Sequence, residues 1–285
     1  MAGEAAGRFT VRPLESPSEF KQVEAVQRAA WGMEPLEVVP AALLIAVAHE
    51  GGLVAGAFDG VRMVGFVFGF PTADPRRHHS HMLAVLPELR GTGLAARLKL
   101  FQRAWCLARG IRQVDWTFDP LMGLNARFNV HKLGCVVRRY LTDFYGPLSG
   151  INAGTPTDRF LAEWHLDSPR VRAAAGRLEA DGRAAARDPD DPDPGQLPLA
   201  NRVEGGRPAG FALPDAPRFA VEIPGDFAYL LRHEPALAMQ WRIHARELFT
   251  RCFEAHYAVV DFVRRGGRNF YVLERGNESR EQPEP

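Results

Sequence analysis

The sequence contains little cysteine and almost no lysine. Its 285 residues include only three cysteines, and lysine occurs only at positions 21, 99 and 132. The cysteines are far apart, show no metal-ligand spacing, and are too few and odd in number for a disulfide framework. The sequence therefore predicts a cytoplasmic protein without a metal site.

The sequence also has no large excess of charge of either sign and no long apolar run. Thirty-five basic residues stand against thirty-four acidic ones, so the formal net charge is +1. Without an excess of positive charge we expect neither nucleic acid nor a membrane surface as a partner. The longest apolar stretch, residues 38–48, is far shorter than the roughly 20 residues that span a bilayer. The first nine residues lack the segments of a secretion signal.

What the sequence does contain is the balance of a globular protein, with 46% hydrophobic and 24% charged residues. Periodicity along residues 9–166 predicts the order β-α-α-β-β-β-α-β-α-β-β, an α/β layer built on one sheet. Ser16 or Ser18 is expected to begin the first helix, and Asp59-Gly60 to turn a hairpin. We place one domain at residues 8–168.

The composition changes after this domain. Alanine, arginine, aspartate, proline and glycine dominate, which predicts a linker or insertion over residues 169–216. A strand–helix–hairpin region follows at 217–275, and a flexible tail at 276–285. The order of elements in 217–275 resembles that of residues 114–166, which is compatible with a degenerate duplicated half.

A glycine pair between a strand and a helix is the most informative motif. The segment Leu83-Ala-Val-Leu-Pro-Glu-Leu-Arg-Gly-Thr-Gly-Leu-Ala95 ends a strand, passes Gly91 and Gly93, and opens a helix. Glycines let successive backbone N–H groups converge, and the helix N-terminus adds partial positive charge. This combination predicts an anion site suited to a pyrophosphate. The alternative is a turn that only connects strand to helix.

Two phosphate interpretations of the segment can be separated. Residues 91–96, GTGLAA, fit the dinucleotide fingerprint G-x-G-x-x-A of a nicotinamide-dependent oxidoreductase. In that fold, however, the first glycine follows the strand directly, whereas residues 87–90 intervene here. The other interpretation is R-x-x-G-x-A at Arg90, Gly93 and Ala95. With V-x-P before it, and two helices and a hairpin earlier in the chain, this segment resembles the GNAT superfamily of N-acetyltransferases.

The resemblance covers about residues 8–168 and implies a fold and a co-substrate. The fold is a mixed, mainly antiparallel sheet flanked by helices, with a smaller half-GNAT-like C-terminal appendage. The co-substrate is acetyl-CoA or succinyl-CoA, and a strand backbone N–H near Leu83 or Ala84 would polarise its carbonyl group. The cofactor-binding residues are then Leu83, Ala84, Val85, Arg90, Gly91, Thr92, Gly93, Leu94, Ala95 and Asn125.

A second match begins at Asn125. The segment Asn125-Ala-Arg-Phe-Asn-Val-His-Lys-Leu-Gly134 resembles the family helix in which the asparagine bonds the pantetheine arm and a tyrosine protonates the departing thiolate. Val130 stands at that tyrosine position. Tyr140 and Tyr145 are therefore the candidate acids, with ordinary strand aromatics as the alternative. The missing tyrosine also leaves open a non-catalytic acyl-CoA sensor.

Deprotonation of the amine requires a general base. The candidates are His79, His81 and Glu88. His79 and His81 point to the same face of the strand. We place His81 as the catalytic base, and a hydrogen-bonded strand histidine is the alternative. His78 adds a third imidazole, but no further ligand stands at a useful spacing for a metal.

The residues expected to bind the amine substrate, which accepts the acyl group, lie in a polar loop, residues 152–159. Asp158 and Arg159 are its candidate substrate-binding residues, because an arginine can pair a carboxylate bidentately, and a surface ion pair is the alternative. Several segments resemble a branch of predicted acetyltransferases similar to amino-acid N-succinyltransferases, which implies a small amine acceptor such as an amino acid. A homodimer is compatible with this assignment. Arg242 and Arg246, at helical spacing, predict a charged helix surface.

Overall fold

The structure is a computed structural model that describes residues 8–146, 155–181 and 196–276. The chain groups into two compact units. Unit 1 is Met1–Trp116 with Glu163–Arg187, and unit 2 is Thr117–Ala162 with Asp188–Pro285. This grouping differs from the predicted domain ranges, because the chain passes from one unit to the other within two strands.

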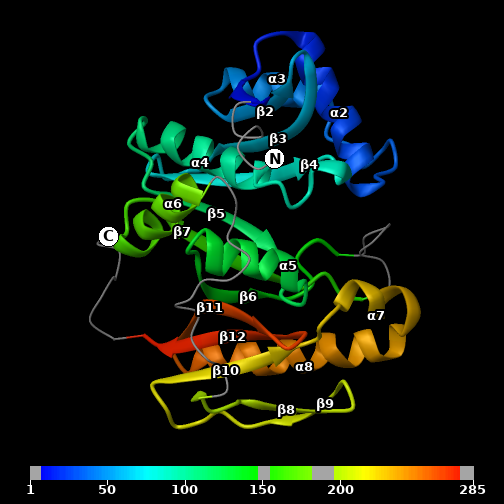
Figure 1. The fold of residues 1–285 in the computed structure, drawn as a ribbon, viewed down its shortest axis with the longest axis vertical. Coiled ribbons are helices and arrows are strands. Elements are labelled where there is room, and N and C mark those ends of the chain that lie inside the picture. The colour runs from blue at the N-terminus through cyan, green and yellow to red at the C-terminus, as the bar shows by residue number, and fades with distance from the viewer. Residues whose placement is uncertain (1–7, 147–154, 182–195, 277–285) are drawn as a thin grey trace. The chain divides into compact units, whose positions relative to one another are not determined.

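Unit 1 is a sheet covered by helices on both faces (Figure 1). Its elements are β1 (Thr10–Pro13), α2 (Pro17–Trp31), α3 (Ala41–His49), β2 (Leu53–Asp59), β3 (Arg62–Pro71), β4 (Arg77–Val85), η1 (Pro87–Leu89), α4 (Leu94–Leu107), α6 (Pro169–Asp181) and parts of β5 (Gln113–Phe118) and β7 (Arg159–His165). Strands β1 to β4 pair antiparallel in chain order, and β5 runs parallel to β4. The sheet is therefore mixed and mainly antiparallel, as predicted.

Two neighbouring residues of β3 show which helix covers which face. Phe66 packs edge-on against Trp31 of α2, with ring centroids 6.1 Å apart. A Cβ on Gly65 would lie 3.3 Å from Leu98 of α4. Successive strand residues point to opposite faces, so α2 and α4 cover opposite faces of the sheet.

The first helix begins where the sequence predicts. The Ser16 side chain accepts a hydrogen bond from the backbone of Glu19, and the Glu19 carboxylate accepts one from the backbone of Ser16. This capping box satisfies two of the donors left free at a helix start. Gly32, with φ of 66°, ends the helix. The buried residues of this helix are Phe20, Val23, Val26, Gln27 and Ala30.

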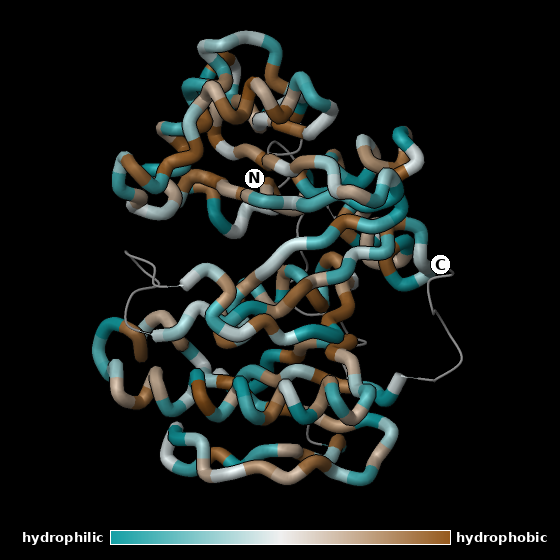
Figure 2. The backbone as a smooth tube through the Cα atoms, turned by 180° about the vertical axis from the view of Figure 1, so that it is seen from behind, coloured by the Kyte–Doolittle hydropathy of each residue, from teal (hydrophilic) through white to brown (hydrophobic). Residues whose placement is uncertain are grey.

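Unit 2 contains a second set of strands with one long helix. Its elements are α5 (Gly123–Ala126), η2 (Arg127–Lys132), β6 (Val136–Leu141), β8 (Asn201–Glu204), β9 (Arg207–Phe211), β10 (Arg218–Ile223), α7 (Phe227–His233), α8 (Pro235–Glu254), β11 (Tyr257–Arg265), β12 (Arg268–Arg275) and the remaining parts of β5 and β7. The strands follow the order β7-β6-β11-β12-β10, and β8 pairs with β9 in a separate hairpin. Hydrophobic and hydrophilic bands alternate along α8, the long helix in the lower part of Figure 2.

Unit 2 contains the same arrangement of two neighbouring strands twice, and the two copies run in opposite directions. β6 lies beside β7, β11 lies beside β12, and β6 and β11 meet as antiparallel neighbours at Val137 and Val259. Each of these two strands follows a helix that ends in a residue with positive φ, Gly134 at 77° and His256 at 59°. An antiparallel pair between equivalent residues is what a local two-fold axis produces. The arrangement therefore supports the duplicated half suggested by the order of elements.

The structure corrects three sequence expectations. The linker or insertion predicted over 169–216 contains the helix α6 and the β8–β9 hairpin, because its apolar residues pack: Val171 and Ala200 are buried. The strand expected to reach Tyr145 ends at Leu141, since the chain turns at Asp143, which has φ of 45°. The predicted helix near Asn125 continues as a π-helix, η2. The tail after 276 and residues 152–154 lie outside the described residues.

No helix in the described ranges is both long enough and apolar enough to cross a membrane.

Candidate active site

The loop between β4 and α4 presents its backbone rather than its side chains. Gly91 and Gly93 have φ of 79° and 88°, a region that L side chains rarely adopt. Gly93 immediately precedes α4, and no side chain caps that helix. The first N–H groups of α4 therefore stay available to an anion.

The polar side chains of this loop donate hydrogen bonds to backbone carbonyls of the protein. Arg90 Nη2 donates to the carbonyl of Ala30, at the end of α2, at 2.6 Å. Thr92 Oγ1 donates to the carbonyl of Leu89 at 2.7 Å. Leu94 is buried. Arg90 thus braces the loop against α2, which leaves the glycine backbone as the part that can meet a ligand.

The C-terminal half of β4 has a neighbour on one side only within the described pairings. The β4–β5 ladder joins Arg77–His79 to Gln113–Asp115, whereas the β3 ladder continues to Val85. The N–H of Leu86 donates to β3 at 2.9 Å. Because strand residues alternate in direction, the N–H groups of Leu83 and Val85 face away from β3 and that of Ala84 faces towards it.

The predicted base lies on β4 beside aromatic rings. His81 is exposed, and its ring centroid lies 5.5 Å from Phe68 and 5.6 Å from Phe70. Its partner His79 lies 5.9 Å away. Desolvation lowers the pKa of His81 and, together with the charge of His81, lowers that of His79 to about 4. Both shifts favour the neutral imidazole, which is the form that a base requires.

His78 points to the opposite face and is fully buried. Its ring lies 5.6 Å from that of Trp105, and neither ring nitrogen has a hydrogen-bond partner among the described residues. Burial lowers its pKa to about 4. Within the described residues, no three His, Cys, Asp or Glu side chains gather into a cluster that could hold a metal ion.

In unit 2, Asn125 lies exposed on α5, one turn before η2. Val130, at the position of the family tyrosine, is fully buried in η2. A valine side chain offers no proton, and its burial keeps this position away from solvent. The described geometry therefore provides no acid at this point of the helix.

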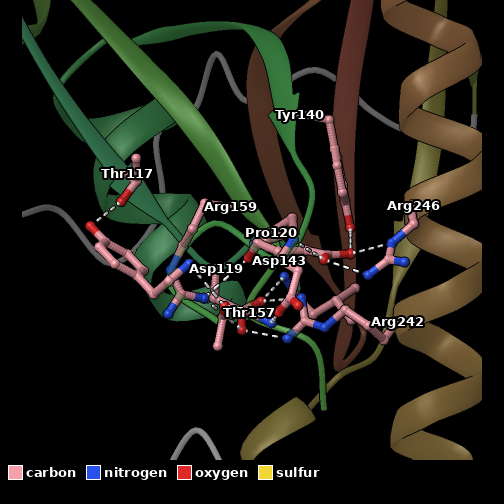
Figure 3. A network of polar contacts seen from close by, with 12 residues as sticks. Thr117, Asp119, Pro120, Tyr140, Asp143, Thr157, Arg159, Arg242 and Arg246 are labelled. Carbon is pink, nitrogen blue, oxygen red and sulfur yellow. Dashed lines mark hydrogen bonds and ion pairs between the residues drawn. The ribbon is translucent and has the colours of Figure 1, made fainter. Parts of the chain in front are cut away.

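Asp158 is fully buried and is the centre of a hydrogen-bond network. Figure 3 shows its partners Tyr140 and Arg246 within this network. It accepts from Tyr140 Oη at 2.7 Å, from the backbone of Asp143 at 3.0 Å, and from Arg246 Nε and Nη2 at 2.9 and 2.7 Å. Burial opposes ionisation, but these donors outweigh it and lower the pKa of Asp158. The carboxylate has no lone pair left for a substrate, so its contacts position Tyr140 and Arg246.

Arg159 belongs to a neighbouring buried cluster around Asp119. Arg242 holds Asp119 bidentately, at 2.9 and 2.5 Å. Arg159 Nη1 lies further away, 3.6 Å from Asp119 Oδ2, and donates to the backbone carbonyl of Asp158 at 3.1 Å. Two buried arginines thus share one carboxylate. The cluster carries one surplus positive charge.

Tyr145 is the more accessible of the two candidate acids. Its side chain is 43% exposed, its hydroxyl lies 3.0 Å from Thr117 Oγ1, and Arg159 sits over its ring at 5.4 Å. Tyr140 donates to Asp158, and burial followed by the Asp158 charge raises its pKa. Of the two phenols, only Tyr145 has a hydroxyl free of a carboxylate within the described network.

Sequence reasoning missed the roles of Asp119, Arg242 and Arg246. The expectation of a charged helix surface is wrong for Arg242, which is 1% exposed and enters the core as the partner of Asp119. The i,i+4 spacing of the two arginines was a usable signal. It places both on one face of α8, and Figure 3 shows both reaching towards the carboxylates.

Comparisons with known proteins agree with the fold. Residues 15–134 match the profile described as the acetyltransferase (GNAT) family. The protein yncA from Salmonella typhimurium, with its cofactor acetyl-CoA, is 16% identical over 57% of this chain and 96% of its own, with a TM-score of 0.47. The ribosomal-protein-S18-alanine N-acetyltransferase of Escherichia coli is 14% identical over 56% and 95%, with a TM-score of 0.46. No curated protein sequence matches the chain.

Residues 15–134 are therefore similar in sequence to the GNAT acetyltransferase family. The predicted GNAT fold and N-acyltransferase class are confirmed, and unit 2 adds a further C-terminal sheet region. The matched range includes GTGLAA, which favours the acyltransferase interpretation of this segment over the dinucleotide fingerprint.

Proposed function

We propose that the protein transfers an acetyl or succinyl group from CoA to the amine of a small acceptor that carries a carboxylate, such as an amino acid. The backbone-lined loop at Gly91–Gly93 carries the proposal. A pyrophosphate needs convergent N–H donors and a partial positive charge, and this loop offers both, because Arg90 and Thr92 are turned to other contacts. The other proposed cofactor contacts are the backbone of Leu83 and Val85 and the side chain of Asn125.

The chemistry assigned to the residues is acyl transfer through a tetrahedral intermediate. The amine attacks the thioester carbon, a C–N bond forms, the C–S bond breaks, and the thiolate leaves. His81 takes the proton lost by the amine, and Tyr145 gives a proton to the thiolate. The N–H of Leu83 polarises the carbonyl oxygen. Much of the rate enhancement comes from holding both substrates in attack geometry.

The surplus positive charge at Arg159 supports an acceptor with a carboxylate. Removing a charge from water into a protein interior is costly unless a counter-charge accompanies it. A substrate carboxylate near Arg159 would supply that counter-charge to the Asp119–Arg242–Arg159 cluster. Acetyl and succinyl donors are distinguished by activity alone, so both belong in the test.

The test combines a substrate screen with one loop variant. The full-length protein is supplied with acetyl-CoA or succinyl-CoA and a panel of amino acids, simple amines and a lysine peptide, and free thiol is measured. In Gly93→Asp a carboxylate faces the phosphates, so acyl-CoA binding should be lost while the fold survives. Gly60→Asp, at another positive-φ turn of unit 1, is the matched control. Unchanged CoA affinity in folded Gly93→Asp would remove the proposed site.

A non-catalytic acyl-CoA sensor is the second candidate, because Val130 replaces the family tyrosine. Acyl-CoA binding that Gly93→Asp abolishes, with no turnover of any amine in the panel, would favour the sensor.

A further inference from the structure

Unit 2 contains a cavity of about 620 Å³ that none of the residues discussed above for acyl transfer lines. It lies among the β8–β9 hairpin, the turn between β10 and α7, the two helices, and the start of β12. A volume of this size accommodates a small organic molecule.

One wall of the cavity is apolar and rigid. Leu230, Leu237 and Trp241 come from α7 and α8, and all three are mostly buried. Trp241 Nε1 donates to the carbonyl of Gly206 at 3.1 Å and ties the hairpin to α8. The cavity is therefore bounded by packed side chains and a tethered hairpin.

The polar lining contains exposed charged side chains of both signs. Neither the side chain of Arg207, at the start of β9, nor that of Glu234, between α7 and α8, has an ion-pair partner among the described residues. Asp226, a third charged side chain of the lining, accepts a hydrogen bond from the backbone of Tyr229 at 2.9 Å. Glu222 accepts both Arg268 Nε, at 2.7 Å, and Arg268 Nη2, so that ion pair neutralises itself. Arg207 and Glu234 are therefore the charged side chains of the lining that make no other side-chain contact within the described residues.

The repeat in unit 2 relates this cavity to the Arg159 cluster. Arg159 is the first residue of β7, and Arg268 is the first residue of β12, the strand in the equivalent place. Each arginine lies beside an acid at the end of a neighbouring strand in the sheet order, Asp119 after β5 and Glu222 in β10. The two halves thus present a charged end at the same point of their folds. The second half opens there into the cavity.

We infer that this cavity binds a small zwitterion with an apolar side chain, an α-amino acid, at a site separate from the acyl-transfer residues. Arg207 receives the carboxylate, Glu234 receives the ammonium group, and the side chain packs against Leu237 and Trp241. The inference does not depend on the proposed function, because it concerns binding and not turnover.

The binding test uses the only tryptophan of unit 2 as a reporter. The full-length protein is labelled with 5-fluorotryptophan, and the Trp241 signal, assigned with Trp241→Phe, is followed by ¹⁹F NMR. Phenylalanine is titrated in parallel with 3-phenylpropionate, which lacks the amine, and with 2-phenylethylamine, which lacks the carboxylate. Phenylalanine should shift the Trp241 signal with saturation, and each truncated compound should bind roughly tenfold or more weakly, because a hydrogen-bonded charge is lost.

Variants separate this cavity from the Arg159 cluster. Arg207→Gln and Glu234→Gln should each weaken phenylalanine binding at the Trp241 reporter by about tenfold, because each removes one charged contact. Arg202→Gln, on the same hairpin but outside the cavity, and Arg159→Met should leave it unchanged. A Trp241 signal that does not move with phenylalanine overturns the inference. Equal binding of the amine or the acid alone, or binding that Arg207→Gln leaves intact, also overturns it.

Discussion

Buried carboxylates of unit 2 and a buried histidine of unit 1 stand in different surroundings. In unit 2 each buried carboxylate has an arginine partner, because Asp119 faces Arg242 and Asp158 faces Arg246. In unit 1 the buried imidazole of His78 has no partner for either nitrogen within the described residues, and burial lowers its pKa to about 4. A buried charge is therefore compensated at Asp119 and Asp158, whereas His78 is buried in its neutral form.

The difference predicts different weaknesses. A compensated ion pair does not titrate near neutral pH, but loss of one partner leaves a bare charge in the core. A neutral buried base tolerates an apolar replacement, but acid must either charge it or unfold the protein around it. Unit 2 should therefore be sensitive to side-chain truncation, and unit 1 to low pH.

The largest effect is expected for Arg242→Met in unit 2. The variant removes both hydrogen bonds of Arg242 to buried Asp119 and leaves Arg159, 3.6 Å away, as the remaining cation, so the free energy of unfolding should fall by up to about 3–5 kcal/mol. Urea denaturation at pH 7 measures it. The matched control is Arg62→Met, which breaks an exposed pair with Glu88 in unit 1 and should cost less than about 1 kcal/mol. Equal costs for the two variants would contradict the comparison.

Asp119→Leu combined with Arg242→Met sharpens this result. Because the double variant would leave buried Arg159 without its carboxylate, it is made together with Arg159→Met. Removing all three charges should cost less than removing Arg242 alone, because no unpaired charge of this cluster remains. If the triple variant is the less stable one, the cost lies in packing and not in charge.

The second effect is acid sensitivity that depends on His78. The unfolded pKa is 6.5 and the folded one about 4, so the unfolded chain binds more protons between these values and stability falls as the pH falls through this window. The loss should reach about 2 kcal/mol by pH 5. In His78→Leu this part of the pH dependence should disappear, with little change at pH 8. His49→Gln, an exposed histidine of the same unit, should keep the wild-type profile.

The third effect tests the surplus charge around Asp119. Arg159→Met keeps the long stem beneath Tyr145 but removes the guanidinium group. Because hydrogen bonds to charged groups contribute about 1.5–3 kcal/mol, the KM for an amino-acid acceptor should rise by about tenfold to a hundredfold. The KM for acyl-CoA should hardly change. A rise in the acyl-CoA KM instead would move Arg159 from the acceptor side to the donor side.

Most of the fold could be predicted because its signals are local. Ser16 and Glu19 cap the start of a helix, and Asp59-Gly60 forms the turn of a hairpin. Gly91 and Gly93 are the residue type expected where the backbone has positive φ. The β8–β9 hairpin could not, because residues 201–211 are rich in arginine and glycine and their order depends on contacts such as Trp241 with the Gly206 carbonyl.

Within the candidate site, the Gly91–Gly93 loop could be predicted from the sequence, whereas the hydrogen-bond network of Asp158 and Asp119 could not. The proposed phosphate loop offers its backbone, and glycines between a strand and a helix are visible in the sequence. The arginine partners of Asp158 and Asp119 are distant in the chain: Arg246 is 88 residues from Asp158, and Arg242 is 123 residues from Asp119. No local pattern records such pairings. Only the i,i+4 spacing of the two arginines pointed to a shared face.

The smallest predicted effect distinguishes the two phenols of unit 2. Tyr145→Phe keeps the ring under Arg159 and removes only an accessible hydroxyl, so kcat should fall by about tenfold or more with stability nearly unchanged, since general acids typically contribute at least this much. Tyr140→Phe removes one hydrogen-bond donor of buried Asp158 and should lower the free energy of unfolding by about 1 kcal/mol. Its kcat should be nearly unchanged, because Arg246 and the Asp143 backbone still donate to the carboxylate. Steady-state kinetics and urea denaturation of both variants read the two quantities separately. If Tyr140→Phe loses turnover while Tyr145→Phe keeps it, the acid is the buried phenol, and the compensated network of unit 2 takes part in catalysis as well as in stability.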